Sequence, residues 1–152
     1  MSTTATQAQQ DERQTVVFVL ANEHYGVDVS VVLEIIRMVD VTPMPAAPDF
    51  VKGMINLRGR VIPVVDLRER FGFPAGAPDK DSRILVVEVA GEDIGIIVDA
   101  VSEVMRIPAD SIEPAAFAAA GDRATFVEGI ANTDGKLIIL LDLAAALARS
   151  AQ

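Results

Sequence analysis

Phe50–Phe71 reads F-V-K-G-M-I-N-L-R-G-R-V-I-P-V-V-D-L-R-E-R-F, an apolar strand that is interrupted by a polar tip and then resumes. Met54-Ile55 and Val61–Val65 predict two paired strands, because β-branched and apolar residues favour strands and a glycine in the turn reaches positive φ without a steric cost. Asn56–Gly59 is the predicted tip. The stretch therefore predicts a β-hairpin around which the chain is organised.

Features beside and after the tip refine this hairpin. Pro63 has no N–H to donate, which predicts an edge position for the second strand. Asp66 closes that strand and predicts a short helix over Leu67–Phe71. The same stretch contains four basic residues, Arg58, Arg60, Arg68 and Arg70. They predict a local basic patch toward which an acidic protein surface could be steered. For any one of them, an ordinary solvated face is an equally good explanation.

The composition predicts a globular protein with a sizeable core. Hydrophobic residues make up 51% of the 152 residues, whereas aromatic residues make up only 5% and tryptophan is absent. Aliphatic residues dominate, which favours small β-barrels over a large ligand cavity. One domain or two small coupled subdomains both fit this length.

Charge and cysteine content exclude several classes of site. The net charge of −9 argues against nucleic-acid binding, which needs Lys and Arg to neutralise phosphates. The absence of cysteine rules out disulfides, thiolate metal sites and a cysteine nucleophile, and it favours a reducing cytosol. Residues 1–14 predict a polar disordered tail, and no apolar run approaches the roughly 20 residues of a membrane helix.

The chain also contains an internal repeat. Val16–Val29 follows the same pattern as Leu85–Val98, with Tyr25 aligned on Ile94, and Phe50–Met54 recurs as Phe126–Ile130. Both segments occur twice in the same order, which predicts two similar β-rich subdomains. The predicted division places the first subdomain at residues 15–76 and the second at 77–152, with Phe73–Ser82 as the linker.

Short helices are predicted at two further places. Val31–Ile36 follows a possible cap at Ser30 and predicts one or two helical turns. Ala144–Ala151 is rich in alanine and leucine and predicts a closing helix.

The two copies diverge at the hairpin tip. The first has Asn56–Gly59 with Arg58 in the turn, whereas the second has Asn132–Gly135, whose Asp-Gly pair suits a type I′ turn by geometry alone. Glu34 of the first copy falls on Glu103 of the second. Because a turn does not require arginine, Arg58 is a signal of function.

Convergent catalytic residues are missing from the sequence. His24 is the one histidine and lies in a predicted turn, where the structural interpretation is favoured. Gly53–Gly59 lacks the following Lys-Ser/Thr of a phosphate loop, and no segment has the ligand spacing of a calcium loop. We therefore expect no enzymatic activity, no cofactor and no metal site.

The motifs above resemble the CheW family of bacterial chemotaxis coupling proteins, over about Val16 to Leu147. The segments that carry the resemblance are Tyr25–Asp28, Val32–Ile35, Phe50–Gly53 with Asn56–Gly59, Pro63–Leu67 and Gly95–Asp99. The resemblance implies an all-β fold, with two SH3-like five-stranded β-barrels, short helices and a C-terminal helix.

The resemblance also implies a cytoplasmic adaptor that couples the helical hairpin tips of chemoreceptors to the histidine kinase CheA at the membrane-associated receptor array, without entering the membrane. The receptor-binding residues implied in this way are Val32, Glu34, Ile35, Asn56, Arg58 and Gly59. Kinase binding is implied for the second subdomain, at Ile96, Val98, Val101 and Val104. We further expect Glu34 and Arg58 to form an ion pair.

Two other functions are weighed against the adaptor. A β-barrel that binds a small ligand would want aromatic residues around a cavity, and the chain has one tyrosine and no tryptophan. An enzyme with a carboxylate site would need a constellation of titratable groups that the sequence does not show.

Overall fold

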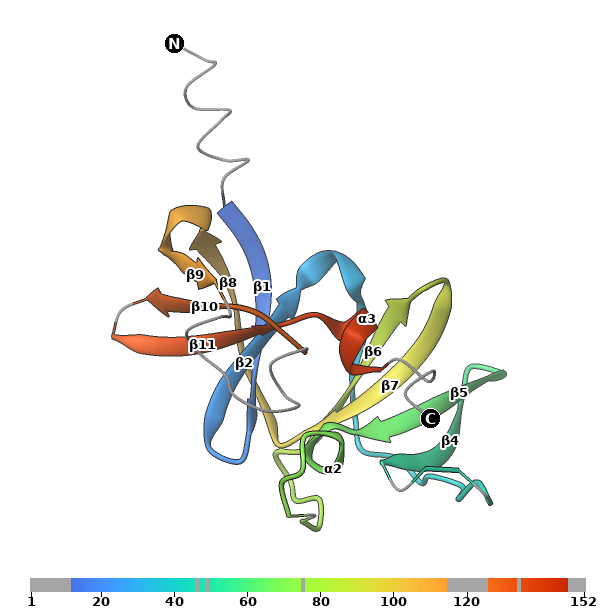
Figure 1. Ribbon diagram of the computed structural model, residues 1–152. Coiled ribbons are helices and arrows are strands. Elements are labelled where there is room, and N and C mark those ends of the chain that lie inside the picture. Colours follow the sequence, from blue (N-terminus) through green and yellow to red (C-terminus); the bar gives the residue numbers. More distant parts are fainter. Residues whose placement is uncertain are drawn as a thin grey trace. The chain divides into compact units, whose positions relative to one another are not determined.

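The computed structural model describes residues 12–45, 47–48, 50–74, 76–114, 126–133 and 135–147 (Figure 1). Strands dominate these ranges. They are β1 (Glu12–Leu20), β2 (Glu23–Asp28), β3 (Val32–Arg37), β4 (Val51–Leu57), β5 (Arg60–Asp66), β6 (Arg83–Val89), β7 (Glu92–Val98), β8 (Ala100–Pro108), β9 (Ile112–Pro114), β10 (Val127–Thr133) and β11 (Lys136–Leu141). Two short α-helices, α2 (Leu67–Arg70) and α3 (Leu143–Ala146), and two 3₁₀ turns, Val29–Val31 and Ala109–Ser111, complete the described elements.

The strands form two sheets. One has six strands in the order β8-β1-β2-β11-β10-β9, and the other has five in the order β3-β6-β7-β5-β4. The predicted mainly-β fold is confirmed. The hairpin expected at the centre of Phe50–Phe71 is β4–β5, which pairs from Val51↔Val65 to Leu57↔Arg60.

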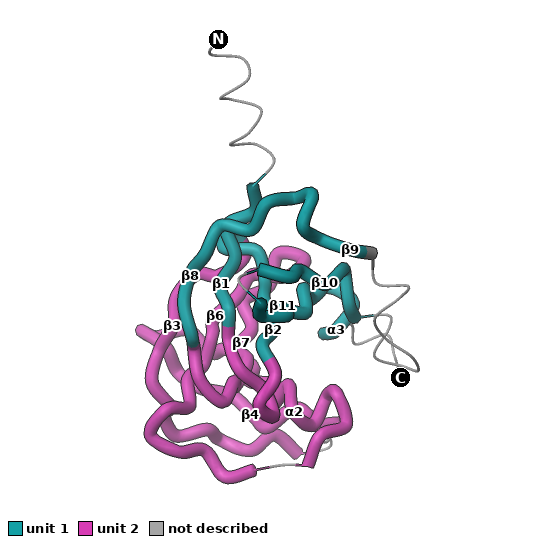
Figure 2. Tube along the Cα trace, turned by 90° about the vertical axis from the view of Figure 1, so that its left-hand side faces the viewer, with its two compact units in different colours: residues 1–17, 24–30, 102–152 teal, residues 18–23, 31–101 magenta. Residues whose placement is uncertain are grey.

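The chain divides into two compact units, coloured separately in Figure 2. Unit 1 consists of residues 1–17, 24–30 and 102–152, and unit 2 of residues 18–23 and 31–101. The predicted division at 76/77 differs from this arrangement, because strands of both sequence copies enter each sheet. The six-stranded sheet takes the β1–β2 hairpin from the first copy, and the five-stranded sheet takes β6–β7 from the second.

The end of the predicted tail is already part of a sheet. Glu12, Arg13 and Gln14 open β1, and the remainder of the predicted tail lies outside the described residues. Arg13 is held there by an ion pair with Glu128 of β10, with 2.5 Å between Nη1 and Oε1. Polar composition alone could not show that this strand starts before its apolar run.

The parallel pairings show how the repeat is built. Gly26 of β2 lies opposite Leu140 of β11, and Gly95 of β7 lies opposite Val64 of β5. In the alignment of the two copies, Gly95 is the counterpart of Gly26 and Leu140 is the counterpart of Val64. The duplication is therefore preserved in strand register, with the two first hairpins exchanged between the sheets.

Val31–Ile36, predicted as helical, is mostly strand. Only its first residue belongs to the 3₁₀ turn, and β3 begins at Val32. Partly buried and exposed side chains alternate along β3, the period of a strand rather than of a helix. Most of these residues are β-branched, which favours strand over helix and explains the error.

The predicted edge position of Pro63 is also wrong, because β5 lies between β7 and β4. Hydrogen-bonded and non-hydrogen-bonded pairs alternate along an antiparallel hairpin, and Leu57↔Arg60 closes the turn, so Met54↔Pro63 is a non-hydrogen-bonded pair. The parallel ladder with β7 begins at the next residue, Val64. Pro63 therefore removes no ladder hydrogen bond although its strand is internal.

Aliphatic side chains fill the core of each unit. Unit 1 packs Val17, Ile107, Ala131, Ile138 and Leu140 together. Unit 2 does the same with Ile55, Ile62, Val64, Ile84 and Val86. Sheets whose inner faces are filled in this way are packed cores rather than ligand cavities.

Helices α2 and α3 begin in the same way in both copies. The backbone N–H of Asp66 donates to Phe50 O and that of Asp142 to Phe126 O, each at 2.8 Å. The Asp66 carboxylate caps α2 by accepting from the Arg68 N–H at 2.9 Å. The predicted start of α2 is confirmed. The predicted C-terminal helix begins as α3, and the part of Ala144–Ala151 after Leu147 lies outside the described residues.

Burial raises the pKa of Asp66, more than its backbone hydrogen bonds with Arg68 and Glu69 lower it. Ionisation of Asp66 is therefore less favourable in the folded state than in the unfolded chain, and its effect is to reduce stability as the pH rises through the carboxyl range. Asn at this position keeps the cap acceptor without the charge. In urea titrations, we expect the free energy of unfolding of Asp66→Asn to rise relative to that of the wild type as the pH increases from acidic to neutral. A difference between the two proteins that is the same at every pH would contradict this.

Gly53 permits a close backbone approach at the outer edge of β4. Thr42 forms an isolated bridge to Met54, in which each backbone nitrogen lies 2.8 Å from the carbonyl oxygen of the other residue. Gly53 has a φ of +147°, and a Cβ built there would lie 2.0 Å from the carbonyl oxygen of Thr42. A side chain would therefore be strained by both its backbone angle and the contact.

We expect Gly53→Ala to lower the free energy of unfolding by about 2 kcal/mol or more, because it combines a disfavoured φ with a backbone clash. Gly59→Ala is the matched control, since Gly59 also has a positive φ, of +84°, but no atom within 4 Å of its built Cβ. Chemical denaturation should show the smaller loss for Gly59→Ala. Equal losses would mean that the Thr42 contact does not matter.

Candidate functional site

The β4–β5 tip is a two-residue turn made by Arg58 and Gly59. Their φ values are +52° and +84°, as a type I′ hairpin requires. Arginine is a costly residue for the first of these positions, where Asn, Asp and Gly are favoured. Ala90 adopts the same φ, of +53°, in the β6–β7 turn, so the feature that distinguishes Arg58 is its side chain rather than its backbone angle.

The Arg58 guanidinium forms a two-point ion pair with Glu34. Its Nη1 lies 2.5 Å from Oε2 of Glu34, and its Nη2 lies 2.9 Å from Oε1. The predicted ion pair is confirmed. Two parallel hydrogen bonds fix the orientation of both side chains, which a lysine could not do.

The position of this pair in the sheet explains why it matters. Glu34 belongs to β3, the outer strand at one side of the five-stranded sheet, and Arg58 follows β4, the outer strand at the other side. The pair therefore links the two ends of the strand order and helps to close the sheet of unit 2 into a barrel. Ile36, on the same face of β3 as Glu34, packs against the unit 2 core, so Glu34 lies on the core side of this strand.

The ion pair shifts the protonation of both partners. The hydrogen bonds from Arg58 lower the pKa of Glu34 below its ordinary value, more than partial desolvation raises it. The Glu34 carboxylate in turn raises the pKa of Arg58. Both side chains are therefore charged at neutral pH.

Asn56 and Gly59 support the tip. Asn56 Oδ1 accepts a hydrogen bond from the Gly59 N–H at 2.9 Å, so Asn56 braces the turn that presents Arg58. Both residues are exposed. They lie beside Arg58, and the hydrogen bond between them serves the turn itself; their role in a binding site stays a prediction.

Exposed apolar residues flank the pair. Ile35 is 41% exposed and Val61 64% exposed, and Val32 is half-buried. Adjacent residues of a strand point to opposite faces, so Glu34 and Ile35 do not share one face of β3. They are nevertheless both accessible at the outer strand, where a partner running along β3 meets the charge and the apolar side chain together.

The predicted kinase-binding residues fall into two groups. Ile96 and Val98 are fully buried on β7, so their side chains have no surface for a partner, and their interpretation as surface residues is corrected. The error has a physical cause: β7 lies inside its sheet between β6 and β5, and its apolar run reads as a core strand. Val101 is half-buried and Val104 is 58% exposed on the outer strand β8.

The predicted basic patch consists of arginines that already have partners within the chain. Arg58 is paired with Glu34, Arg60 with Asp93, and Arg68 with Asp99. Arg70 lies over the ring of Phe50, with 4.9 Å from its Cζ to the ring centroid. Three of the four arginines are therefore paired with carboxylates within the chain, and the fourth lies over an aromatic ring.

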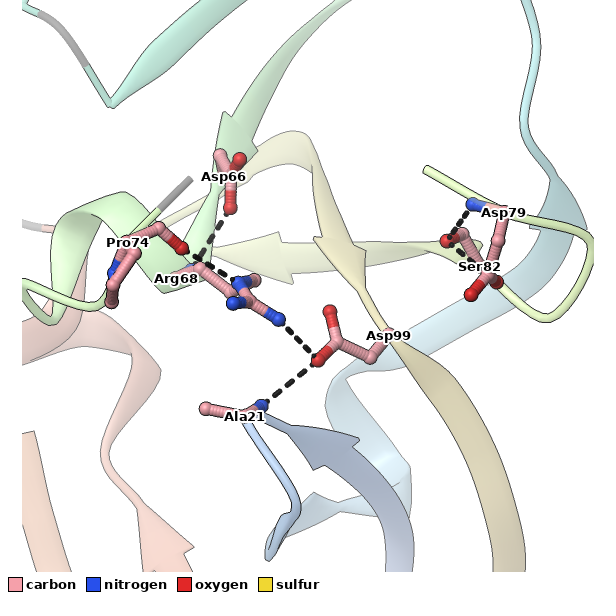
Figure 3. A network of polar contacts seen from close by, with 7 residues as sticks. All are labelled: Ala21, Asp66, Arg68, Pro74, Asp79, Ser82 and Asp99. Carbon is pink, nitrogen blue, oxygen red and sulfur yellow. Dashed lines mark hydrogen bonds and ion pairs between the residues drawn. The ribbon is translucent and has the colours of Figure 1, made fainter. Parts of the chain in front are cut away.

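Arg68 is the centre of a polar network that sequence reasoning missed (Figure 3). Its Nη1 donates to Asp99 Oδ2 at 2.8 Å and its Nε to Pro74 O at 3.0 Å. The same oxygen of Asp99 accepts from the Ala21 N–H at 2.9 Å. The network fastens the β1–β2 turn and the segment after α2 to the end of β7. The internal repeat gives no signal for it, because the second copy has Ala144 where the first has Arg68.

Other groups offer little chemistry. His24 is partly buried in β2, opposite Ile138, rather than in a turn. Among the residues that the structure describes, no three His, Cys, Asp or Glu side chains are grouped to hold a metal ion. No helix in the described part of the chain is long and apolar enough to cross a membrane.

The Glu34–Arg58 pair has a pH signature. Because the folded-state pKa of Glu34 is lowered, the stability that it contributes is present above the ordinary glutamate pKa and is lost as the pH falls through the folded-state value. NMR titration of the Glu34 carboxyl carbon should give a pKa below that of a model glutamate. Arg58→Ala should raise that pKa, and an unchanged value in the variant would show that Arg58 is not the cause.

Comparison with known proteins agrees with this architecture. Residues 14–151 match the family model described as the CheW-like domain. A chemotaxis protein CheW from Klebsiella aerogenes is 34% identical over 131 residues, which cover 86% of this chain and 79% of the relative. CheW from Rhizobium meliloti is also 34% identical over 131 residues, covering 86% and 84%.

A solved structure gives the same answer in three dimensions. The crystal structure of the scaffolding protein TtCheW from Thermoanaerobacter tengcongensis superposes with a TM-score of 0.85 at 46% identity, covering 92% of this chain and 95% of that one. The two-barrel CheW fold implied by the repeat is thereby confirmed. The chain therefore belongs to the CheW family of chemotaxis scaffold proteins.

Proposed function

We propose that this chain is a non-enzymatic adaptor that couples chemoreceptor tips to the histidine kinase CheA. The observation that carries the proposal is the Glu34–Arg58 pair, an exposed charged fork held on a strained turn beside exposed apolar residues. Family membership supports the scaffold role. The adaptor works in the cytoplasm, at the receptor array, through its partners rather than by entering the membrane.

The receptor tip docks on unit 2, on the surface that Arg58 orients. A helix bound to a protein surface needs apolar anchors for affinity and a few fixed polar groups for register. Val32 and Ile35 supply anchors at β3, and Glu34 with Arg58 supplies the fixed charges. Asn56 and Gly59 contribute by holding the turn in place.

The kinase docks through β8, most of which belongs to unit 1. Val104 is the most exposed of the predicted kinase-binding residues, and Val101 precedes it on the same strand. An outer strand with apolar side chains is suited to pair with another β-domain. Two units with different partners allow one chain to hold a receptor and a kinase at the same time.

The packed interiors argue against the alternative of a small-ligand barrel. Buried aliphatic residues occupy the core of each unit, and ligand pockets are instead lined by aromatic and convergent polar groups. Enzymatic activity has no constellation to support it among the described residues. Incubation with ATP and magnesium should leave the purified chain unlabelled.

The test is to measure receptor-tip binding for Arg58→Ala and Glu34→Ala. We expect each change to weaken binding of a receptor-tip helical hairpin by about thirtyfold, because a well-placed interface arginine is a typical hot spot. Kinase binding and the melting temperature should stay close to those of the wild type, since exposed ion pairs contribute little to stability.

Arg60→Ala is the matched control, because Arg60 is close to Arg58 on the same hairpin, similarly exposed and paired with Asp93 instead. It should weaken receptor binding far less than Arg58→Ala. Unchanged receptor affinity in both Arg58→Ala and Glu34→Ala, with the fold preserved, would remove this pair from the site.

A further inference from the structure

Two arginines lie directly opposite each other where β3 pairs with β6. Arg37 closes β3 and is in register with Arg83, which opens β6. Residues that are directly opposite in an antiparallel pair share one face of the sheet, and like charges in such positions destabilise the pair. The stability of the sheet therefore does not explain why both positions are arginine.

The contacts of the two guanidinium groups leave their charges uncompensated. Arg83 Nη1 donates to the carbonyl oxygens of Lys80 at 2.9 Å and of Ser82 at 2.8 Å. These bonds hold the side chain in place, but a carbonyl carries no formal charge. Arg37 is exposed, and its side chain makes no hydrogen bond or ion pair with any residue that the structure describes. The pair thus consists of one fixed cation and one free cation.

Acidic residues nearby in the sequence do not neutralise the pair. Asp79 Oδ1 accepts from the Asp81 N–H at 2.8 Å and lies 3.4 Å from Ser82 Oγ, so Asp79 holds the turn before β6. Within the described ranges, no ion pair joins Arg37 or Arg83 to a carboxylate. This differs from Arg58, which has a carboxylate partner. A carboxylate from a partner protein can therefore bind between the two arginines.

Exposed aliphatic side chains continue the same face of β3. Leu33 is 49% exposed and Ile35 is 41% exposed, and they alternate with partly buried residues along the strand. Arg37 falls in the same alternation and so lies on the same face. Read along β3, this outer face presents two aliphatic residues followed by the basic pair.

The internal repeat contains the aliphatic and basic residues twice but the second arginine once. The counterparts of Ile35 and Arg37 are Val104 and Arg106, which are both exposed on the outer strand β8. The counterpart of Arg83 is Gln14. Two opposed cations are therefore a feature of unit 2, the unit that carries the Glu34–Arg58 pair.

We propose that Arg37 and Arg83 determine which receptor tips the chain binds, by selecting tips that carry a carboxylate next to an aliphatic residue. This inference rests on the proposed function and adds a charge requirement to it. The Glu34–Arg58 pair is neutral as a whole, so it orients a partner without favouring an acidic one. The uncompensated charges of Arg37 and Arg83 supply that preference, because charge complementarity decides between partners of similar shape.

Strand and helix geometry give the spacing that the partner needs. Ile35 and Arg37 are two residues apart on a strand, which places them about 6.6 Å apart along it. Residues four positions apart on a helix are separated by about 6 Å along its axis and share one face. A receptor helix aligned with β3 therefore sets an aliphatic residue on Ile35 and an acid, four positions away, between Arg37 and Arg83. A carboxylate has two oxygens and can accept from both guanidinium groups.

The first experiment compares Arg37→Glu with Arg106→Glu. Both changes replace an exposed arginine of an outer strand and alter the net charge equally. Calorimetry measures binding of a receptor-tip helical hairpin and of the kinase regulatory domain, with circular dichroism and melting temperature as fold controls. We expect Arg37→Glu to weaken receptor binding at least tenfold and Arg106→Glu to change it less than twofold. The melting temperature of Arg37→Glu should equal or exceed that of the wild type, because its new acid lies opposite Arg83.

The second experiment identifies the carboxylate on the partner. Each acidic residue of the receptor-tip hairpin is replaced by glutamine in turn, and each hairpin is titrated with the wild-type chain and with Arg37→Gln. We expect one acid, four positions from an aliphatic residue, whose loss weakens binding to the wild type but not to Arg37→Gln. The advantage of the wild type should shrink as the salt concentration rises. Equal losses with both chains at every acid would overturn the inference.

The outcomes separate this inference from the proposed function. Unchanged receptor affinity in folded Arg37→Glu and Arg83→Gln, together with a loss in Arg58→Ala, overturns the selection by charge and leaves the adaptor role intact. A loss of kinase binding instead of receptor binding also overturns it. So does binding of the wild type to vesicles of anionic phospholipid that Arg37→Glu abolishes without a change in receptor affinity. A wild-type chain that binds neither the receptor tip nor the kinase domain overturns the proposed function and the inference with it.

Discussion

The parallel pairing of β5 with β7 and of β2 with β11 is the constraint on which the rest of the structure depends. Each pairing joins strands from different sequence copies, so neither copy completes its sheet alone. Parallel neighbours need long connections. The chain joins β5 to β7 through α2 and β6, and it joins β2 to β11 through the strands of unit 2. A substitution in one copy therefore acts on a sheet that also contains strands of the other copy.

That exchange also marks the limit of what the sequence could predict. The β4–β5 hairpin, its tip, the cap at Asp66 and the duplication follow from local patterns, because turn residues, caps and repeated spacing act over short stretches of chain. Which hairpin enters which sheet depends on contacts between strands that are far apart in the sequence. Because the two copies are similar, the sequence pattern fits a topology with exchanged hairpins as well as one without exchange. The same reason explains Pro63. Its place in an internal strand could not be predicted, because pairing with β7 sets the register in which no ladder hydrogen bond needs the N–H that proline lacks. The helix predicted at Val31–Ile36 is wrong because a short apolar run fits the helical period and the strand period equally well. Packing against the core then decides between helix and strand.

At the candidate site, sequence reasoning found the charges but not their arrangement. Arg58 was visible because it stands in a turn where arginine is not needed, and Glu34 because the family resemblance placed it nearby. The arginines that follow looked like a free basic patch, yet each described one has a partner, since carboxylates from β3, β7 and the end of β7 come within reach only after folding. The sequence could not distinguish Ile96 and Val98 from surface residues, because a buried strand and an exposed apolar strand contain the same types of residue.

The two hairpin tips place similar charges but hold them differently. Both units place an acid of an outer strand against a base near a hairpin tip, and both keep an aliphatic residue next to each charge. The first difference is in the turn, where unit 2 has Arg58 at positive φ and gains a bidentate ion pair with Glu34. The second is in the neighbouring strand, where Asp93 pairs with Arg60 in unit 2, whereas the counterpart of Asp93 in the other copy is His24. A rigid fork restricts the orientation of whatever it contacts, whereas a lysine on a flexible stem tolerates several. The duplicated arrangement therefore holds a rigid cation in unit 2 and a flexible one in unit 1.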